Sequence, residues 1–149
     1  MQQTFTPADP DFDRRVRESF DRQAMMKTLG VAIASLEPGR IELVFSHRPE
    51  ITQQHGFVHA GAVAGVLDSA CGYAAFSLMP PEAAVLTVEF KVNLMRPADG
   101  ERYHVDGEVL RAGRTLTVCH ASARIEGESE NLAIMTATLM TVKGAGIVD

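Results

Sequence analysis

One acidic residue, Asp68, lies within the most apolar stretch of the chain, residues 60–79. Aspartate is seldom fully buried without a partner, and a carboxylate held in an apolar cleft is a candidate functional group. Such a carboxylate can take a proton from water as a general base or attack a carbonyl carbon as a nucleophile. The alternative is a structural carboxylate that accepts a backbone amide or pairs with an arginine. The residues alone leave both possibilities open.

The other candidate nucleophiles are less well placed than Asp68. Ser69 and Cys71 have no base near them in sequence, and no Gly-x-Ser-x-Gly motif is present. Cys71 and Cys119 lie far apart without a Cys-x-x-Cys pair, a pattern typical of small buried apolar residues in a reducing compartment. We therefore expect neither a serine or cysteine nucleophile nor a metal site.

The stretch that carries Asp68 predicts a helix over residues 60–79 that is apolar nearly all round. Such a helix either spans a membrane or is buried in a protein, and an Asp near its middle favours the buried helix. Gly61, Gly65, Asp68 and Gly72 fall on one stripe of this helix. Because each glycine costs roughly 0.8–1 kcal/mol of helix stability relative to alanine, the stripe indicates that a sheet, a second helix or a ligand approaches it closely.

The flanking segments must position this helix. Residues up to Pro10 are expected to form a loose arm, and residues 11–29 have helical spacing that Gly30 ends. Strands grouped on both sides of one helix predict an α+β fold with an antiparallel sheet wrapped around the central helix. We expect an N-terminal arm and helix over 1–30 and a single domain over 31–149. The predicted strands are 31–36, 40–46, 85–95, 102–111, 114–125 and 131–142.

The predicted strand 85–95 has the clearest pattern of the six. Its apolar residues alternate strictly with polar ones, which is typical of a half-buried strand. The apolar positions are Leu86, Val88, Phe90, Val92 and Leu94, and the polar positions are Thr87, Glu89, Lys91 and Asn93.

Composition excludes several classes of function. The chain has 149 residues, enough for one domain with its own core, and a net charge of −5. No basic patch is evident, so we expect no nucleic-acid partner. The N-terminus lacks the basic segment and apolar core of a secretory signal, which predicts a cytoplasmic protein with no membrane partner.

A motif before the central helix resembles a known family. The sequence QQHGFVHAG at 53–61, followed by Leu67 and Asp68, is similar to the hot-dog-fold acyl-CoA thioesterases of the phenylacetate-pathway (PaaI-like) type. The family pattern is an Asn or Gln, then HG, then HGG, then an Asp nine positions beyond the second His. His59 and Asp68 keep that spacing. The resemblance covers roughly 40–142 and continues through TVEFKVN at 87–93, RPA at 96–98 and GRTL at 113–116.

The resemblance implies a hot-dog fold, hydrolysis of acyl-CoA thioesters to free acid and CoA, and neither metal nor cofactor. It implies homodimers that pair into tetramers, with Asp68 as nucleophile or general base. The backbone amide of Ala60, after the motif residue His59, would hold the thioester oxygen. Amides in the first turn of a helix lack intrahelical acceptors and carry partial positive charge, so they suit a developing oxyanion. Gln53 would orient the thioester or the water, and Thr87 would support the water or the acid.

Three more residues are implied to bind substrate. Gly61 follows the oxyanion amide, while Gly113 and Arg114 fall where CoA phosphates are often met in the family. The chain also departs from the family pattern at two positions. Ala60 replaces the usual Gly and keeps the amide while adding a methyl group, and Gln53 stands where many members have Asn.

Two other functions are compatible with such a fold. A hot-dog hydratase or dehydratase would use a His with an Asp or Glu in a different signature, and the Pro-rich approach to its helix is missing here. A non-catalytic acyl-CoA-binding protein would have no need of Asp68. The behaviour of an Asp68→Asn variant therefore distinguishes a binder from a hydrolase.

Overall fold

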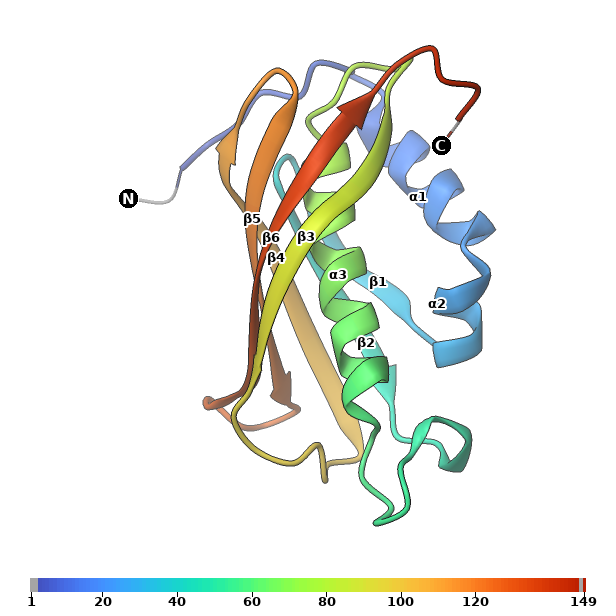
Figure 1. Cartoon of the computed structure of the whole chain (residues 1–149), viewed down its shortest axis with the longest axis vertical. Helices are drawn as coiled ribbons and strands as arrows, with labels where there is room; N and C mark the ends of the chain where they lie inside the picture. Colours follow the sequence, from blue (N-terminus) through green and yellow to red (C-terminus); the bar gives the residue numbers. More distant parts are fainter. Residues whose placement is uncertain (1–2, 148) are drawn as a thin grey trace.

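The computed structural model describes residues 3–147 and 149, so the first two residues of the expected arm and residue 148 lie outside the described residues. Figure 1 shows a sheet with one long helix, α3, against it, and a pair of shorter helices on the far side of α3. The elements are α1 Phe12–Arg22, α2 Ala24–Leu29, β1 Ala32–Glu37, β2 Arg40–Ser46, the 3₁₀ turn η1 Pro49–Ile51, α3 Ala60–Phe76, β3 Ala84–Leu94, β4 Arg102–Ala112, β5 Leu116–Ile125 and β6 Asn131–Val142.

The sheet has six strands in the order β1-β2-β4-β5-β6-β3, and every neighbouring pair is antiparallel. All six strands match the predicted runs to within two residues at each end, and the predicted α+β class is confirmed. The strand β3 comes directly after α3 in the chain but pairs with β6 at the edge of the sheet. This edge position places β3 alongside the helix that carries Asp68 (Figure 1).

The helix α3 is buried, as its composition predicts, although it ends at Phe76 rather than at Met79. The most buried side of α3 faces the sheet, and β4 approaches it closely at Gly107. A Cβ atom on Gly107 would lie only 2.6 Å from the carbonyl oxygen of Ala70, so glycine is required for this packing. Within the described part of the chain, no helix is long and apolar enough to cross a bilayer.

The three glycines of the predicted stripe, Gly61, Gly65 and Gly72, make no close contact with the sheet. A Cβ atom added at Gly72 would meet nothing within 4 Å, and one at Gly65 would reach only Leu29 and Met25 of α2 at 3.8 Å. Gly65, Asp68 and Gly72 are accordingly half-buried. The close neighbour that the stripe predicts is therefore not supplied by residues 3–147 or 149.

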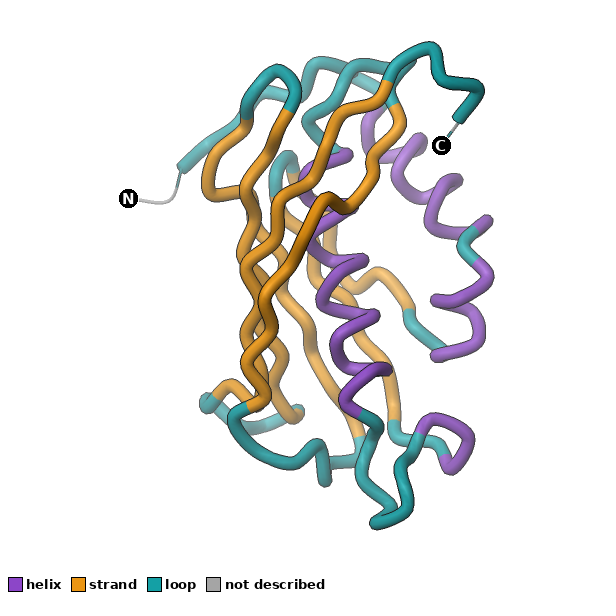
Figure 2. The backbone as a smooth tube through the Cα atoms, viewed as in Figure 1, coloured by secondary structure: helices purple, strands orange, loops and turns teal. Residues whose placement is uncertain are grey.

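Residues 11–29, predicted as one helix, form two helices, so the prediction is wrong at Gln23. Gln23 is extended, with φ −78° and ψ 101°, and separates α1 from α2. Figure 2 shows the break as a short loop between the two helices. The predicted stop at Gly30 is confirmed, because Gly30 adopts the left-handed conformation (φ 69°) that ends α2.

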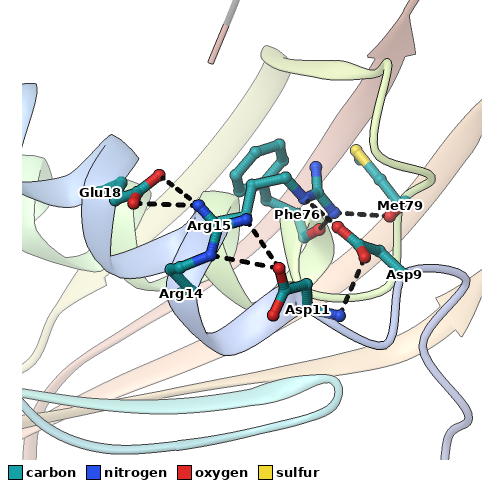
Figure 3. A network of polar contacts seen from close by, with 7 residues as sticks. All are labelled: Asp9, Asp11, Arg14, Arg15, Glu18, Phe76 and Met79. Carbon is teal, nitrogen blue, oxygen red and sulfur yellow. Dashed lines mark hydrogen bonds and ion pairs between the residues drawn. The ribbon is translucent and has the colours of Figure 1, made fainter.

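The segment before α1 is anchored rather than loose. Asp9 is buried and accepts Nε of Arg15 at 2.8 Å, while Nη2 of Arg15 donates to the Met79 carbonyl at 2.6 Å (Figure 3). The Arg15 guanidinium also lies 4.2 Å from the centre of the Phe76 ring. A cation is favourable beside the carbonyl end of a helix, so this cluster fixes α1 to the C-terminal end of α3. The division into 1–30 and 31–149 stays a prediction.

A β-bulge in β3 changes which side chains face α3. Thr87 pairs with Leu139 and Glu89 pairs with Thr138, so Val88 is the extra residue without a partner in β6. Before the bulge, Val85 and Thr87 face α3. After it, the inward positions are Phe90, Val92 and Leu94, which pair with the buried residues Ala137, Met135 and Ala133.

The strict alternation predicted for this strand is therefore wrong at the bulge. Thr87 shares the inward face with Phe90, while Leu86 faces outward. As an edge strand, β3 is also more exposed than the predicted half-buried strand. Phe90 is 45% exposed and Leu94 is 49% exposed even though both face α3.

Candidate active site

The carboxylate of Asp68 is half-buried and accepts one hydrogen bond. The hydroxyl of Thr87 donates to Oδ1 of Asp68 at 2.8 Å. Burial raises the pKa of the Asp68 carboxyl above its ordinary value of 3.8, and the Thr87 hydroxyl opposes this by stabilising the charged form. Among the described residues neither a backbone amide nor an arginine binds Asp68. The partners expected of a purely structural carboxylate are thus missing from that part of the chain.

The start of α3 is capped by a side chain. His59 is the N-cap residue, and its Nδ1 accepts the backbone N–H of Gly61 at 2.7 Å. This bond stabilises the first turn, where amides have no intrahelical acceptor. The amide of Ala60 donates to no acceptor among the described residues, whereas the amide of Gly61 is already engaged. Ala60 therefore offers a free donor at the positive end of the helix.

A cavity of about 460 Å³ lies in front of this helix terminus. Gln53, His59 and Ala60 line it together with apolar residues that include Leu94 of β3. The side-chain oxygen of Gln53 accepts the backbone amide of His55, and the Gln53 NH₂ group has no acceptor among the described residues. The structure thus brings three of the predicted site residues to one place.

Gly113 and Arg114 lie elsewhere, in the hairpin between β4 and β5. They line a cavity of about 210 Å³ with Met79 and Lys143, at the C-terminal end of α3 (Figure 1). A Cβ atom on Gly113 would lie 2.5 Å from the Leu116 carbonyl oxygen, so glycine is needed for this tight turn. Arg114 is exposed and has no hydrogen-bond or ion-pair partner within the described residues.

The predicted site residues therefore form three separate groups in one chain. Ala60 and Asp68 are eight positions apart on α3, which at 1.5 Å per residue is about 12 Å along the axis. The group at Ala60 and the pair formed by Asp68 and Thr87 cannot both touch one thioester carbonyl within this chain. Arg114 lies at the opposite end of α3 from Ala60.

Sequence reasoning missed a polar cluster beside Asp68. Ser69 donates to the side-chain oxygen of Gln23 at 2.9 Å, and Nε2 of Gln23 lies 3.3 Å from the Tyr73 hydroxyl, to which it donates. Ser19 shares a hydrogen bond of 3.2 Å with the same hydroxyl. No local signal marks Gln23, because glutamine is an ordinary helix former in an apparently continuous helical segment.

The remaining reactive groups are buried. Both cysteines are free, and burial raises the pKa of each thiol, that of Cys119 to about 12. A thiol so far from ionisation is a poor nucleophile, in agreement with the sequence prediction. Within residues 3–147 and 149, no group of three or more His, Cys, Asp or Glu side chains is arranged to hold a metal ion.

Comparison with known proteins identifies the class to which this fold and site belong. Residues 55–131 match the family model of the thioesterase superfamily, and this segment includes both the helix-capping motif and Asp68. The fold is the hot-dog thioesterase fold, with the antiparallel sheet wrapped around α3. The chain belongs to the thioesterase superfamily, and the resemblance stated from the sequence is confirmed.

Individual relatives agree with this assignment. A thioesterase family protein from Silicibacter pomeroyi is 58% identical, with a TM-score of 0.86 over 89% of this chain and 99% of that one. The medium/long-chain acyl-CoA thioesterase YigI of Escherichia coli is 26% identical over 132 residues, 76% of this chain and 83% of YigI. The Escherichia coli PaaI protein, at 17% identity, shares the fold with a TM-score of 0.83 over 92% of this chain and 97% of that one.

Proposed function

We propose that this protein hydrolyses acyl-CoA thioesters to a free acid and CoA. The observation that carries the proposal is Asp68, a half-buried carboxylate whose only hydrogen bond among the described residues comes from Thr87. Desolvation raises the pKa of this carboxyl, so the ionised form is a stronger base than an exposed aspartate. The acyl-CoA thioesterase activity named for the relative YigI supports the substrate class.

The chemistry requires one base and one oxyanion donor. With Asp68 as general base, the carboxylate takes a proton from water while the water oxygen bonds to the thioester carbon. The resulting oxyanion accepts the free N–H of Ala60, whose helix terminus supplies a partial positive charge. When the carbon–sulfur bond breaks, the CoA thiolate leaves and recovers the proton from the Asp68 carboxyl.

Direct attack by the Asp68 carboxylate is the other form of the same proposal. It gives an acyl–aspartyl anhydride and the CoA thiolate, and water then hydrolyses the anhydride. Single-turnover hydrolysis in H₂¹⁸O separates the two. If Asp68 is the nucleophile, water that attacks the aspartyl carbon of the anhydride leaves ¹⁸O on Asp68 in part of the molecules. If Asp68 is a general base, it stays unlabelled.

The 12 Å between Ala60 and Asp68 supports an active site shared between two subunits. An antiparallel α3 from a two-fold mate would bring its own Asp68 to the Ala60 terminus of the first chain, and an isologous dimer forms two such sites. A Cβ atom at Gly72 would meet nothing within 4 Å, which leaves room for that approach. A homodimer, pairing further into a tetramer in the cytoplasm, is part of the proposal.

The cavity at the β4–β5 hairpin is proposed to receive the phosphates of CoA. Arg114 and Lys143 both line it, and Lys143 already pairs with Glu82 at 3.2 Å. The net charge of −5 disfavours anions generally, so local cations must attract them. An arginine without a partner among the described residues suits phosphate, because its guanidinium presents several donors in one plane.

The test is hydrolysis of a panel of acyl-CoA esters by the wild type and by Asp68→Asn. We expect turnover of at least one ester, and a fall in kcat of about 10³-fold or more in the variant with its fold retained. CD spectra check the fold. A variant that keeps a tenth of wild-type turnover contradicts the role of Asp68. A wild type that binds acyl-CoA esters without hydrolysing any of them is a binding protein.

A further inference from the structure

A small polar pocket lies directly beside Asp68 and is not used by the chemistry described above. Its volume is about 120 Å³. One wall is the Asp68–Thr87 pair, and Val85 and Asp149 close another side, where Oδ2 of Asp149 accepts the Val85 amide at 2.6 Å. The remaining wall is the polar cluster of Ser19, Gln23, Ser69 and Tyr73. The pocket therefore extends from the reacting carboxylate to a set of hydrogen-bonding groups.

Gln23 is held in this wall by contacts distant in sequence. It accepts a hydrogen bond from Ser69 and donates one to the Tyr73 hydroxyl, and these two residues lie one turn apart on α3. The extended backbone at Gln23 interrupts the helix, and its bonds to α3 hold the side chain where it lines the pocket. The Arg15 cluster at the other end of α1 keeps this segment against α3 (Figure 3).

The chemistry of the pocket restricts what can occupy it. A cavity of roughly 150 Å³ holds a benzene ring, so 120 Å³ accommodates about five non-hydrogen atoms. The carboxylates of Asp68 and Asp149 repel an anionic group. A plain alkyl end would displace water from the hydroxyl and amide groups without replacing its hydrogen bonds, whereas a neutral hydroxyl can both donate and accept.

We propose that Gln23 is a specificity-determining residue and that this pocket receives a short acyl group bearing a neutral hydroxyl. The Ser69 and Tyr73 hydroxyls complete the recognition. The inference rests on the proposed thioester hydrolysis and adds the class of acyl group. It places the hydroxyl of the substrate at Gln23 and the thioester carbon at Asp68, both of which line the same pocket.

The experiment compares two esters of equal chain length, 3-hydroxybutanoyl-CoA and butanoyl-CoA. We expect kcat/KM of the wild type to favour the hydroxylated ester by about tenfold, the effect of one good hydrogen bond. Gln23→Met keeps the length of the side chain and removes its polar atoms, and Tyr73→Phe removes only a hydroxyl. Each variant is expected to bring the ratio close to one. The matched control is Asp21→Asn on the exposed side of α1, which should leave the ratio unchanged.

The outcomes separate this inference from the proposed function. A wild-type ratio near or below one, or a ratio that Gln23→Met and Tyr73→Phe leave intact, overturns the role of Gln23 while hydrolysis by Asp68 stands. If Gln23→Met does not fold, Tyr73→Phe decides the question. If the wild type hydrolyses no acyl-CoA ester, both proposals fail. Loss of preference in both variants with retained turnover of butanoyl-CoA supports the assignment.

Discussion

The hydrogen bond from Thr87 to Asp68 gives the sharpest test of the candidate site. Thr87→Val replaces the hydroxyl with a methyl group of similar size and removes the only hydrogen bond that Asp68 accepts among the described residues. Hydrogen bonds to charged groups contribute about 1.5–3 kcal/mol. Thr87 is exposed and Asp68 half-buried, so solvent screening places this bond at the lower end of that range. The bond also holds the Asp68 carboxylate in one orientation, and a carboxylate that must be oriented again before it reacts loses this contribution in the transition state. Because 1.4 kcal/mol corresponds to tenfold in rate, kcat should fall by about tenfold.

The same substitution should move the pH dependence in a defined direction. The Thr87 hydroxyl stabilises the charged carboxylate and so lowers the pKa of Asp68, against the larger effect of burial, which raises it. Without the hydroxyl, the pKa of Asp68 rises further. Since a base or nucleophile acts only when ionised, the acidic limb of the kcat/KM profile should shift to higher pH in Thr87→Val.

The assay is the pH profile of kcat/KM for one acyl-CoA ester, followed by release of the CoA thiol. Thr87→Ser is the matched control, because it keeps the hydroxyl and loses only the methyl group, and its acidic limb should coincide with that of the wild type. Identical profiles for Thr87→Val and the wild type would refute the argument that Thr87 tunes Asp68. A shift to lower pH would refute the sign.

Three further predictions concern the same residues. Asp68→Asn should raise the melting temperature at pH 7, since burial raises the pKa of Asp68 and its ionised form therefore destabilises the fold. The gain should disappear below pH 3.8, the ordinary pKa of an aspartate, and equal melting temperatures at pH 7 would contradict the prediction. Arg114→Ala should raise KM for a CoA ester more than for the matching pantetheine ester, with Lys27→Ala as the control; equal changes would remove Arg114 from the phosphate site. Mixing the inactive Asp68→Asn and Ala60→Pro variants should restore activity, because each mixed dimer would contain one intact site. The proline in Ala60→Pro is tolerated at the first helical position. If subunits exchange and no activity returns, the shared site is refuted.

Local sequence patterns were sufficient to predict much of the fold. The apolar run with Asp68 predicts a buried helix because the helix has no polar face that could contact water, and α3 is that helix. The strands follow from short alternating runs separated by turn residues, such as Gly39, which adopts φ 79° between β1 and β2. The motif around His59 placed a helix N-terminus correctly, and its imidazole proved to be the cap.

The tertiary structure decided which groups meet. Thr87 reaches Asp68 because a bulge at Val88 shifts the parity of β3, and that bulge arises from pairing with β6, which lies some fifty residues further along the chain. The alternation of residues within β3 cannot show where an extra residue enters the strand, because the bulge depends on pairing with a distant strand. Gln23 breaks a helix that its neighbours would continue, because its side chain bonds to Ser69 and Tyr73 on α3.

The sequence by itself thus determined the helix and the strands and indicated Asp68 and the Ala60 amide as candidate site groups, since these depend on residues close together in the chain. It did not determine the distances among them. In one chain α3 keeps Ala60 and Asp68 about 12 Å apart, a fixed consequence of helical rise. It also did not determine the pocket between Asp68 and Gln23, because that pocket exists only where α1 and Gln23 lie beside α3 and β3. Contacts of this kind join segments far apart in sequence, and only the folded chain defines them.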